Sequence, residues 1–364
     1  MHVTLIAGAR PNFMKISPIL NAIHHKKEQG ADLHFRLVHT GQHYDEKMSS
    51  GFFKDLDIPE PDNNLDCGGG TQAEQTASIM VKFEKELIKF PTDLVLVVGD
   101  VTSTMACAIV AQKMGVKVAH VEAGIRSGDW SMPEEINRLV TDSITNYFFT
   151  TTEVASQNVR NSGVKEEQIF FVGNTMIDTL LKNEPRFEKP SLFDEYKLEP
   201  KNYIVVTLHR PANVDNEVQL NNLLEEIIHH SRNAKLIFPV HPRTRKNLEK
   251  LHFDTSNLIL VEPMGYLEFN YLVKNALAVI TDSGGITEET TVMGIPCMTL
   301  RDTTERPETC TIGTNELLGT NPKNIKPALE KLFNGHWKKG EIPSLWDGKA
   351  AERIVNHLME LFPH

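Results

Sequence analysis

The sequence predicts an α/β protein made of two doubly wound, Rossmann-like domains that face a cleft. Short apolar runs rich in Val and Ile alternate with longer mixed segments, as expected for parallel strands covered on both faces by helices. Two successive sets of this alternation indicate two sheets of βαβ units. The length of 364 residues is comfortable for two domains that each bury a core.

The apolar runs are predicted as strands in chain order. The first, Val3–Ala7, is too short for a signal-peptide core or a membrane span, and we expect a buried strand there. The first half continues with Phe35–His39, Leu94–Val98, Val116–Val121, Tyr147–Thr150 and Ile169–Val172. The second half contains Tyr203–Leu208, Lys235–Val240, Leu258–Val261, Leu277–Thr281 and Pro296–Leu300. Segments between the runs, such as Leu220–His229 and Tyr266–Asn275, are predicted as helices.

The boundary between the domains is predicted between Asn174 and Lys201. Lys189-Pro190 and Glu199-Pro200 are polar, proline-bearing stretches typical of a linker. The C-terminal segment Ala350–Leu361 has the pattern of an amphipathic helix that suits packing on either domain. We assign residues 1–174 with 350–364 to the N-terminal domain and residues 175–349 to the C-terminal domain.

The composition argues against several classes of partner. The formal net charge of −10 disfavours general binding to nucleic acid or to an anionic membrane. The four cysteines form no C-x-x-C pair, which disfavours a zinc site and suits a reduced compartment. Because no segment approaches the length of a membrane span, a cytoplasmic location is expected.

Polar clusters follow nearly every predicted strand. They are Gly8-Ala9-Arg10-Pro11-Asn12, Thr40-Gly41-Gln42-His43, Gly99-Asp100, Glu122-Ala123-Gly124, His209-Arg210, His241-Pro242-Arg243, Asp282-Ser283-Gly284-Gly285 and Arg301-Asp302. Ligands of open parallel sheets bind outside the carboxyl ends of the strands. Loops are polar in any protein, but so many clusters rich in Arg, His and acids favour a functional cleft.

A candidate phosphate site lies in the second half. Ser283, Gly284 and Gly285 follow a predicted strand and open a predicted helix, where free N–H groups bind anions. An ordinary helix cap explains the same pattern about equally well. The chain has no G-x-x-x-x-G-K-[ST] loop, and its first turn is not G-x-G-x-x-G, so ATPase and dehydrogenase functions are disfavoured.

Candidate acid/base groups lie in the first half. Asp100, Glu122 and Glu134 occur at or shortly after strand ends, and proton abstraction from carbon needs a positioned base and acid. Neighbouring carboxylates raise each other's pKa, which lets one hold a proton at neutral pH. Glu134 and Arg138 share a face of a helix begun by Pro133. A plain surface ion pair explains that spacing equally well.

Cations near the same strand ends would supply the positive field that the net charge lacks. A diphosphate leaving group needs that field as negative charge builds on it. The candidates are Arg10, Lys15, His209, Arg210, His241, Arg243, Arg301 and Arg306.

The motifs together resemble the non-hydrolysing UDP-N-acetylglucosamine 2-epimerases. The matching stretches are GARPNFMKISP (8–18), TGQHYD (40–45), GDVTST (99–104), HVEAGIRSGD (120–129), MPEEINR (132–138), GNTMID (173–178), TLHR (207–210), PVHPRT (239–244), TDSGGITEE (281–289) and RDTTERPE (301–308). They occur in family order over almost the whole chain. The resemblance implies the GT-B type fold of two-domain nucleotide-sugar glycosyltransferases.

The resemblance also implies a reaction. The enzyme would remove the C2 proton of UDP-N-acetylglucosamine and expel UDP from C1, leaving a bound glycal. Re-addition of UDP with protonation on the other face would yield UDP-N-acetylmannosamine. No metal or redox cofactor is implied. A homodimer and a role in supplying precursors of surface polysaccharides are expected from the family.

Functional residues carry over from the family by motif. Asp100, Glu122 and Glu134 match the catalytic carboxylates, with Arg138 beside them and His209 as the catalytic or phosphate-contacting histidine. Which carboxylate abstracts the proton stays open. The residues expected to bind UDP are Arg10, Lys15, His241, Arg243, Phe269, Ser283, Gly284, Gly285, Glu289 and Arg301. Among these, Glu289 would accept the ribose hydroxyls, and the backbone of Phe269 would pair with uracil.

Two departures from the family pattern affect regulation and substrate. This chain has Pro211-Ala212-Asn213 after His209-Arg210, where many members read HRREN. Cys67-Gly68-Gly69-Gly70-Thr71-Gln72 replaces a stretch that some bacterial members use to bind a second, activating UDP-sugar. Gln42, His43 and Arg210 of that possible effector region remain. The glycine-rich stretch also resembles relatives that epimerise UDP-2,3-diacetamido-glucuronic acid.

Three rival functions share parts of this evidence. A retaining glycosyltransferase on the same fold would need an acceptor but not three carboxylates near C2. A hydrolysing epimerase would release free N-acetylmannosamine and UDP. A catalytically inactive nucleotide-sugar sensor would typically have lost an acid, whereas this chain retains all three.

Overall fold

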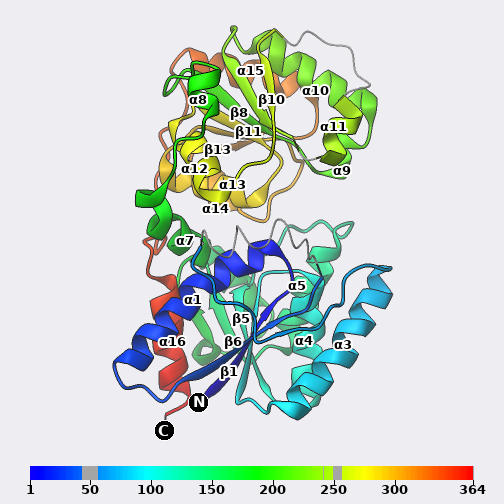
Figure 1. Cartoon of the computed structure of the whole chain (residues 1–364), viewed down its shortest axis with the longest axis vertical. Helices are drawn as coiled ribbons and strands as arrows, with labels where there is room; N and C mark the ends of the chain where they lie inside the picture. Colours follow the sequence, from blue (N-terminus) through cyan, green and yellow to red (C-terminus); the bar gives the residue numbers. More distant parts are fainter. Residues whose placement is uncertain (43–55, 241, 249–255, 364) are drawn as a thin grey trace. The chain divides into compact units, whose positions relative to one another are not determined.

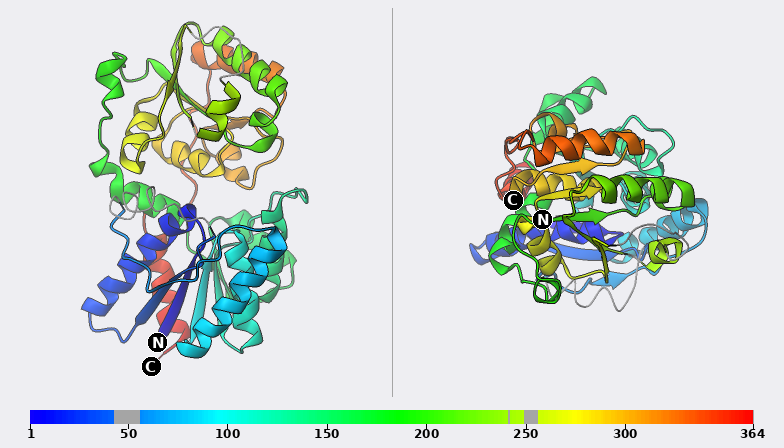
Figure 2. Two further views of the ribbon diagram at one scale, coloured as in Figure 1. Left: turned by 45° about the vertical axis from the view of Figure 1, so that its right-hand side comes forward. Right: turned by 90° about the horizontal axis from the view of Figure 1, so that it is seen from above.

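The structure is a computed structural model that describes residues 1–42, 56–240, 242–248 and 256–363. The chain divides into two compact units, Met1–Lys182 with Ser344–His364, and Asn183–Pro343. Both ends of the chain therefore belong to the first unit, where the markers for the N- and C-termini lie close together (Figures 1 and 2).

The first unit is built on a seven-stranded sheet in the order β3-β2-β1-β4-β5-β6-β7. Each pair of neighbouring strands is parallel. The strands are β1 (His2–Ala7), β2 (His34–His39), β3 (Asn63–Asn64), β4 (Leu94–Val98), β5 (Lys117–Ala123), β6 (Tyr147–Thr150) and β7 (Ile169–Phe171).

Helices cover both faces of this sheet. They are α1 (Arg10–Glu28), α3 (Gln72–Lys89), α4 (Thr102–Lys113), α5 (Pro133–Ile144), α6 (Glu153–Asn161), α7 (Thr175–Asn183) and α16 (Ala350–Leu361), with a 3₁₀ turn at Glu166–Gln168. On one face, Ile79 and Phe83 of α3 join a core with Val95 and Val97 of β4. The chain passes through α1 from β1 to β2 and through α4 from β4 to β5, which are opposite directions along the sheet. Because such crossovers are right-handed, α1 and α4 lie on opposite faces. There α1 packs against α16 (Figure 1).

The C-terminal helix is fastened to the first unit by a buried carboxylate. Asp178 of α7 accepts hydrogen bonds from the backbone N–H groups of Ala350 (3.1 Å) and Ala351 (2.7 Å). These are first-turn donors that have no partner within the helix. Just before the helix, the indole N–H of buried Trp346 donates to the carbonyl of Thr151 at 3.1 Å. Residues 344–364 thus complete the first unit, and all of α7 except Asn183 is counted with it.

The second unit is built on a six-stranded parallel sheet in the order β10-β9-β8-β11-β12-β13. Its strands are β8 (Tyr203–Thr207), β9 (Lys235–Pro239), β10 (Leu258–Val261), β11 (Ala278–Thr281), β12 (Cys297–Thr299) and β13 (Asn315–Leu317). Side chains of β8 alternate between two cores. Ile204 and Val206 pack with residues of α10 and α15, whereas Tyr203 and Val205 pack with residues of α8 and α12. Burial on both faces is the reason for continuous apolar runs.

The helices of the second unit include several of a single turn. They are α8 (Leu192–Glu195), α9 (Pro211–Val214), α10 (Glu217–His230), α11 (Pro242–Leu248), α12 (Tyr266–Asn275), α13 (Gly284–Met293), α14 (Pro307–Thr311) and α15 (Ile325–Phe333), with 3₁₀ turns at Glu184–Arg186 and Pro322–Asn324.

The two sheets share one topology. In each, the strand order reverses beside the first strand, between β1 and β4 and between β8 and β11. Such reversal points open a crevice at the carboxyl ends of the strands, where ligands of doubly wound sheets bind. The α/β fold class predicted from the apolar runs is confirmed, and every predicted strand is present with ends that differ by at most two residues. The short strands β3 and β13 were not predicted, because their residues are largely polar and lie at or near sheet edges.

Candidate active site

Glu122 lies at the carboxyl end of β5 in a strained backbone conformation. Its φ of +72° is uncommon for any residue other than glycine. The pairing of β5 with β6 shifts register between Val121 and Ala123, as at a β-bulge. Strained backbone conformations of this kind are concentrated at functional sites. A β-bulge also points a side chain in a direction that a regular strand would not give it. Here it directs the Glu122 carboxylate to Lys15.

Lys15 of α1 forms a buried ion pair with Glu122. Its Nζ donates to Glu122 Oε2 at 2.6 Å, and the two side chains are only 11% and 3% exposed. A buried charge is tolerated only when it is paired, so each side chain stabilises the other. Lys15 is expected among the UDP-binding residues, but in the structure it is the ion-pair partner of a candidate catalytic carboxylate.

Asp100 follows β4, the strand next to β5, and α5 holds it at two points. The Arg138 guanidinium donates to Asp100 Oδ2 from both Nε (3.1 Å) and Nη2 (2.6 Å). The Asn137 amide donates to the Asp100 backbone carbonyl at 2.9 Å. Arg138 is buried, whereas the Asp100 side chain remains 32% exposed. Asp100 is thus a carboxylate with a fixed direction and access to solvent.

Glu135, rather than Glu134, is the acid of α5 that contacts Arg138 most closely. Glu135 Oε2 accepts from Arg138 Nη1 at 2.6 Å. It also accepts from the backbone N–H and hydroxyl of Ser127, and Oε1 accepts from the N–H of Gly128. Burial opposes ionisation, but these donors lower the pKa of Glu135 overall. Glu135 was not predicted as a site residue. Glu134 is half-buried in the first turn of α5.

The turn after β1 uses its backbone donors internally. Asn12 Oδ1 accepts from the N–H groups of Gly8 (3.1 Å) and Ala9 (2.9 Å), and its amide donates to the carbonyl of Val98 on β4. A Cβ on Gly8 would lie 2.2 Å from Ser103 Oγ, so the close approach of α4 requires glycine there. Arg10 is exposed at the start of α1.

The possible effector residues are only partly within the described structure. Gln42 Oε1 accepts from the backbone N–H (3.2 Å) and hydroxyl (2.8 Å) of Ser103, at the start of α4. Arg210 directly precedes α9. His43 and His241 lie outside the described residues, as does the side chain of Arg243.

In the second unit, Asp282 accepts hydrogen bonds from the segment that follows β8. It is fully buried and accepts from the backbone N–H groups of His209 and Arg210 and from the Asn213 amide. It also contacts His209 Nδ1 at 2.8 Å. Burial works against its charge, but the hydrogen bonds from His209 and the other donors lower the pKa of Asp282.

This contact orients His209, whose side chain is 55% exposed. Because Asp282 is an acceptor, Nδ1 must carry the hydrogen, and Nε2 is then the nitrogen that can exchange a proton or contact a ligand. Asp282 was seen only as part of a strand-end cluster in the sequence. No pattern there indicated that it supports His209, 73 residues away.

The expected phosphate site lies at the start of α13. Ser283 is the N-cap residue, and its side chain makes no capping hydrogen bond. A Cβ on Gly284 would lie 2.5 Å from Glu305 Oε1. The Arg301 guanidinium holds Glu305 at 2.7 and 3.2 Å, and despite burial this pairing lowers the pKa of Glu305 to about 2. A carboxylate therefore lies against the helix N-terminus, where the dipole favours negative charge.

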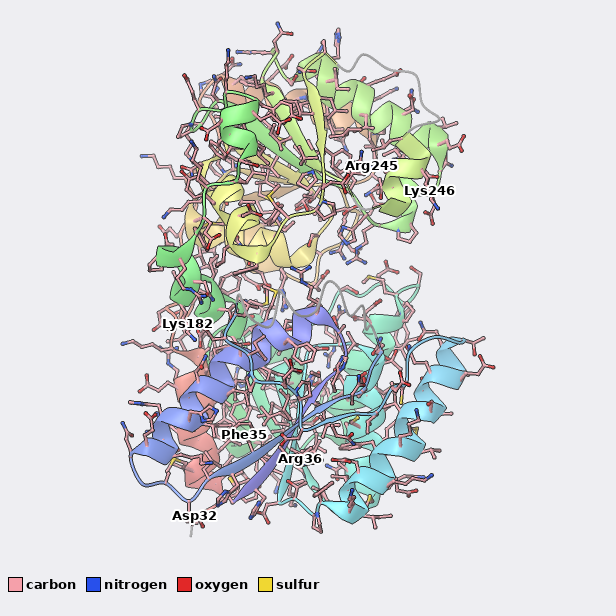
Figure 3. The ribbon with its side chains drawn as sticks, in the orientation of Figure 1. Asp32, Phe35, Arg36, Lys182, Arg245 and Lys246 are labelled. Carbon is pink, nitrogen blue, oxygen red and sulfur yellow. The ribbon has the colours of Figure 1, made fainter. Side chains whose placement is uncertain are left out.

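A pocket of about 500 Å³ lies beside the start of α12. Gly265 and Glu268 line it next to Phe269. Arg245 of α11, labelled in Figure 3, and Glu262 also line it and form an ion pair at 2.8 Å. This volume is within the range of small-ligand sites. Phe269 is half-buried, and its N–H already donates to the carbonyl of Gly265 at 2.9 Å.

Glu289 is buried in α13 and contacts α12. The Tyr266 hydroxyl donates to Glu289 Oε1 at 2.9 Å. Burial raises the pKa of Tyr266 well above its ordinary value, so the hydroxyl keeps its hydrogen. Burial also raises the pKa of Glu289 from 4.5 to about 7, although hydrogen bonds from Tyr266 and Asn270 act in the opposite direction.

Replacing Glu289 by glutamine should flatten the pH dependence of stability. An acid whose pKa is raised in the folded state binds its proton more tightly when folded, so the free energy of unfolding falls as pH rises from about 4.5 to about 7. The fall should be about 3 kcal/mol in the wild type and should be absent for this group in Glu289→Gln. Urea unfolding at about pH 5 and about pH 8 measures it. Glu268→Gln, at the pocket rim, is the matched control, and identical pH profiles for Glu289→Gln and wild type would contradict the assignment.

Two general properties of the described residues bear on function. Within the described ranges, no group of three or more His, Cys, Asp or Glu side chains is placed to hold a metal ion. None of the described helices is both long and apolar enough to cross a bilayer.

Comparison with known proteins identifies the family. The family model for UDP-N-acetylglucosamine 2-epimerase matches residues 25–359. A UDP-N-acetylglucosamine 2-epimerase of Methanocaldococcus jannaschii is 42% identical in an alignment 371 positions long, which covers 98% of this chain and 99% of that protein. A UDP-2,3-diacetamido-2,3-dideoxy-D-glucuronate 2-epimerase of Pseudomonas aeruginosa is 37% identical, with 99% of this chain and 100% of that protein covered.

Solved structures agree with the sequence comparison. The crystal structure of the M. jannaschii UDP-GlcNAc 2-epimerase in complex with UDP-GlcNAc and UDP matches with a TM-score of 0.86 at 41% identity. The match covers 99% of this chain and 100% of that one. The family model, the relatives and the fold agree along nearly the whole length, and this chain therefore belongs to the UDP-N-acetylglucosamine 2-epimerase family.

Proposed function

We propose that this protein is a non-hydrolysing UDP-N-acetylglucosamine 2-epimerase, which interconverts UDP-GlcNAc and UDP-ManNAc. The observation that carries the proposal is the pair of carboxylates at the carboxyl ends of neighbouring strands, Asp100 just after β4 and Glu122 near the end of β5. Asp100 is held by Arg138, and Glu122 is held by Lys15. In a chain of this family, two acids with separate cationic partners suit removal and return of a proton at one carbon.

The proposed reaction is an elimination followed by re-addition. A carboxylate takes the C2 proton, the C2–H electrons form a C1=C2 double bond, and the C1–O bond to UDP breaks. Addition of UDP back to C1 with protonation of the opposite face of C2 gives the epimer. We assign the proton transfers to Asp100, Glu122 and Glu134, with Arg138 fixing Asp100.

UDP binding is assigned mainly to the second unit. Gly284 and Gly285 at the start of α13 would present backbone donors to the diphosphate, and Ser283, whose N–H donates to Thr281 Oγ1 at 3.0 Å, would add its hydroxyl. Arg301 lies against Gly284 through Glu305, which places a guanidinium close to the same helix end. His209, with Nε2 directed by Asp282, would contact the phosphate or the reacting sugar. The remaining assigned contacts are Arg10, His241, Arg243, Phe269 and Glu289.

Assembly and regulation are further parts of the proposal. We expect a homodimer and a location in the cytoplasm, in keeping with the family. Gln42 is bound to Ser103.

A second substrate is favoured by one relative. The P. aeruginosa protein named for UDP-2,3-diacetamido-2,3-dideoxy-D-glucuronate is 37% identical over 99% of this chain. The glycine-rich stretch after Cys67 resembles that group of relatives. A 2-epimerase of this related UDP-sugar is therefore the alternative to UDP-GlcNAc, with the same chemistry at C2.

The decisive experiment is solvent exchange. Incubation with UDP-GlcNAc in deuterated water should yield UDP-ManNAc with deuterium at C2 and the UDP-sugar intact, because the proton abstracted at C2 is replaced from solvent. NMR and mass spectrometry detect it, and a parallel reaction with UDP-2,3-diacetamido-glucuronic acid identifies the preferred sugar. Transfer of the sugar to an acceptor without C2 exchange would instead show a glycosyltransferase. Stoichiometric release of free UDP and N-acetylmannosamine would show a hydrolysing enzyme.

A further inference from the structure

A buried hydrogen-bond network joins β5, α5 and the turn that follows β4, next to the two candidate carboxylates. His120 of β5 is completely inaccessible to solvent. Its Nδ1 lies 2.7 Å from Asp142 Oδ1 on α5, and its Nε2 lies 2.8 Å from the backbone carbonyl oxygen of Gly99. Asp142 Oδ2 also accepts from the N–H of Gly124 at 3.0 Å and contacts Arg126 Nη1 at 2.6 Å.

Both partners of the His120 ring are hydrogen-bond acceptors. A backbone carbonyl can only accept, and a neutral imidazole has only one N–H. Burial opposes the charge on Asp142, but hydrogen bonds from His120 and Arg126 lower its pKa, so Asp142 is a carboxylate that also only accepts. The two contacts are therefore both hydrogen bonds only if the ring carries hydrogen on both nitrogens. His120 is then a buried imidazolium, whose charge Asp142 compensates.

The backbone carbonyl that His120 contacts belongs to Gly99, which adjoins the candidate catalytic carboxylates. Gly99 directly precedes Asp100, and its N–H donates to the carbonyl of Val121, directly before Glu122. A Cβ on Gly99 would lie 3.2 Å from Lys15 Nζ and 3.7 Å from Glu122 Oε2. Gly99 thus adjoins Asp100 along the chain and the Lys15–Glu122 ion pair in space, so a shift of this peptide would disturb both.

The same network also fixes the other side of Glu122. Asp142 binds the N–H of Gly124, two residues after Glu122, while His120 is two residues before it. One imidazolium–carboxylate pair therefore holds the chain on both sides of a residue with a φ of +72°. Without it, the strained conformation of Glu122 would lose its support, because such conformations persist only where the surroundings impose them.

We propose that His120, as a buried imidazolium paired with Asp142, is a positioning residue that holds Asp100 and Glu122 in their working geometry. The inference rests on the proposed epimerase function for the catalytic part of its test. His120 is too deeply buried to touch a substrate, so it acts through the Gly99 carbonyl and through Asp142. Small displacements of catalytic groups have large effects on rate, on the order of 10²-fold for about 1 Å.

A spectroscopic test addresses the protonation state without reference to activity. In protein labelled with ¹⁵N-histidine, the His120 resonances should show hydrogen on both ring nitrogens at about pH 8, where exposed histidines are neutral. These signals should be absent from His120→Gln. A ring with a single N–H at that pH would overturn the imidazolium assignment, whether or not the enzyme is active.

A kinetic test addresses positioning. His120→Gln and Asp142→Asn should each lower kcat for C2 exchange roughly 10²-fold, with KM and UDP affinity changed by less than about threefold. His39→Gln is the matched control, because His39 is a buried histidine of β2 in the same sheet, and it should keep kcat within a few fold of wild type. Circular dichroism checks that each variant is folded.

The outcomes separate the two proposals. Wild-type kcat in both His120→Gln and Asp142→Asn would overturn the positioning role. Parallel losses of kcat and UDP affinity, matched by His39→Gln, would show general damage to the fold and would also overturn it. If wild-type protein shows no C2 exchange with any UDP-sugar, the proposed function fails, while the resonances of His120 still decide its protonation state.

Discussion

Asp100→Asn should lose epimerisation while keeping its affinity for UDP. The amide has the shape of the carboxylate, so Arg138 retains an acceptor oxygen, but the amide can neither take up nor deliver the proton of C2. We expect C2 exchange to fall roughly 10²- to 10⁴-fold, the usual contribution of a general acid or base. Affinity for UDP should stay within a few fold, because the UDP contacts are assigned mainly to the second unit. Deuterium incorporation by NMR and calorimetric titration with UDP measure the two quantities.

A surface pair in the same unit offers the matched control. Arg160 donates to Glu166 from Nε and Nη2, both at 2.8 Å, and the Glu166 side chain is 69% exposed. Glu166→Gln removes a carboxylate from a guanidinium as Asp100→Asn does, yet exposed pairs contribute little. It should therefore leave both exchange and UDP affinity unchanged. Wild-type exchange by Asp100→Asn would remove Asp100 from the mechanism.

Gly124→Ala should cause the largest loss of stability among single methyl additions at the carboxylate site. Gly124 has a φ of +79°, and a Cβ there would lie 2.1 Å from the carbonyl oxygen of Ala155 and 2.7 Å from Val159 Cγ2. Both neighbours belong to α6, whose backbone cannot yield without disturbing its packing on the sheet. Left-handed backbone strain costs about 1–2 kcal/mol and overpacking about 1–3 kcal/mol, so the loss should reach roughly 3 kcal/mol or more. Urea unfolding measures it.

Gly163→Ala separates the two contributions. Gly163 has a similar φ of +84°, but among the described residues, its two chain neighbours aside, no atom lies within 4 Å of the position of its Cβ. It should cost only the backbone strain, about 1–2 kcal/mol. The difference between the two variants is then the cost of the steric clash. Equal losses would show that α6 moves freely away from β5, which would contradict tight packing beside Glu122.

The fold could be predicted well because the sheets are parallel and buried. Strands covered on both faces must be apolar along their length, so runs such as Leu94–Val98 are visible in the sequence with their true ends. The two strands that were not predicted have the same physical explanation. Asn63–Asn64 is an edge strand of the first sheet, and Asn315–Leu317 is an edge strand of the second. Each pairs with a single neighbouring strand. Neither is buried on both faces, so neither has an apolar signature.

The site could be predicted only in part, because its contacts join distant residues. Asp100, Glu122, Arg138 and His209 were recognisable from their places after strands and from family motifs, and their roles stay predictions. The family motifs also placed Arg138 beside the carboxylates, but the sequence did not show which charged groups pair. Lys15 and Glu122 are 107 residues apart, and Asp100 and Arg138 are 38 apart. The spacing of Glu134 and Arg138 favoured a pair within one helix, whereas the structure pairs Arg138 with Asp100 and Glu135.

The sequence by itself determined the fold class, the order of the strands along the chain and the chemical types at the strand ends. Local patterns suffice for these properties, because burial and turn formation act on neighbouring residues. Only the tertiary structure decided which charges meet. Ion pairs such as Lys15–Glu122, and supporting residues such as Asp142 and Asp282, depend on the strand order of the folded sheets. Electrostatic contacts act over a few ångströms in space, whatever the separation along the chain.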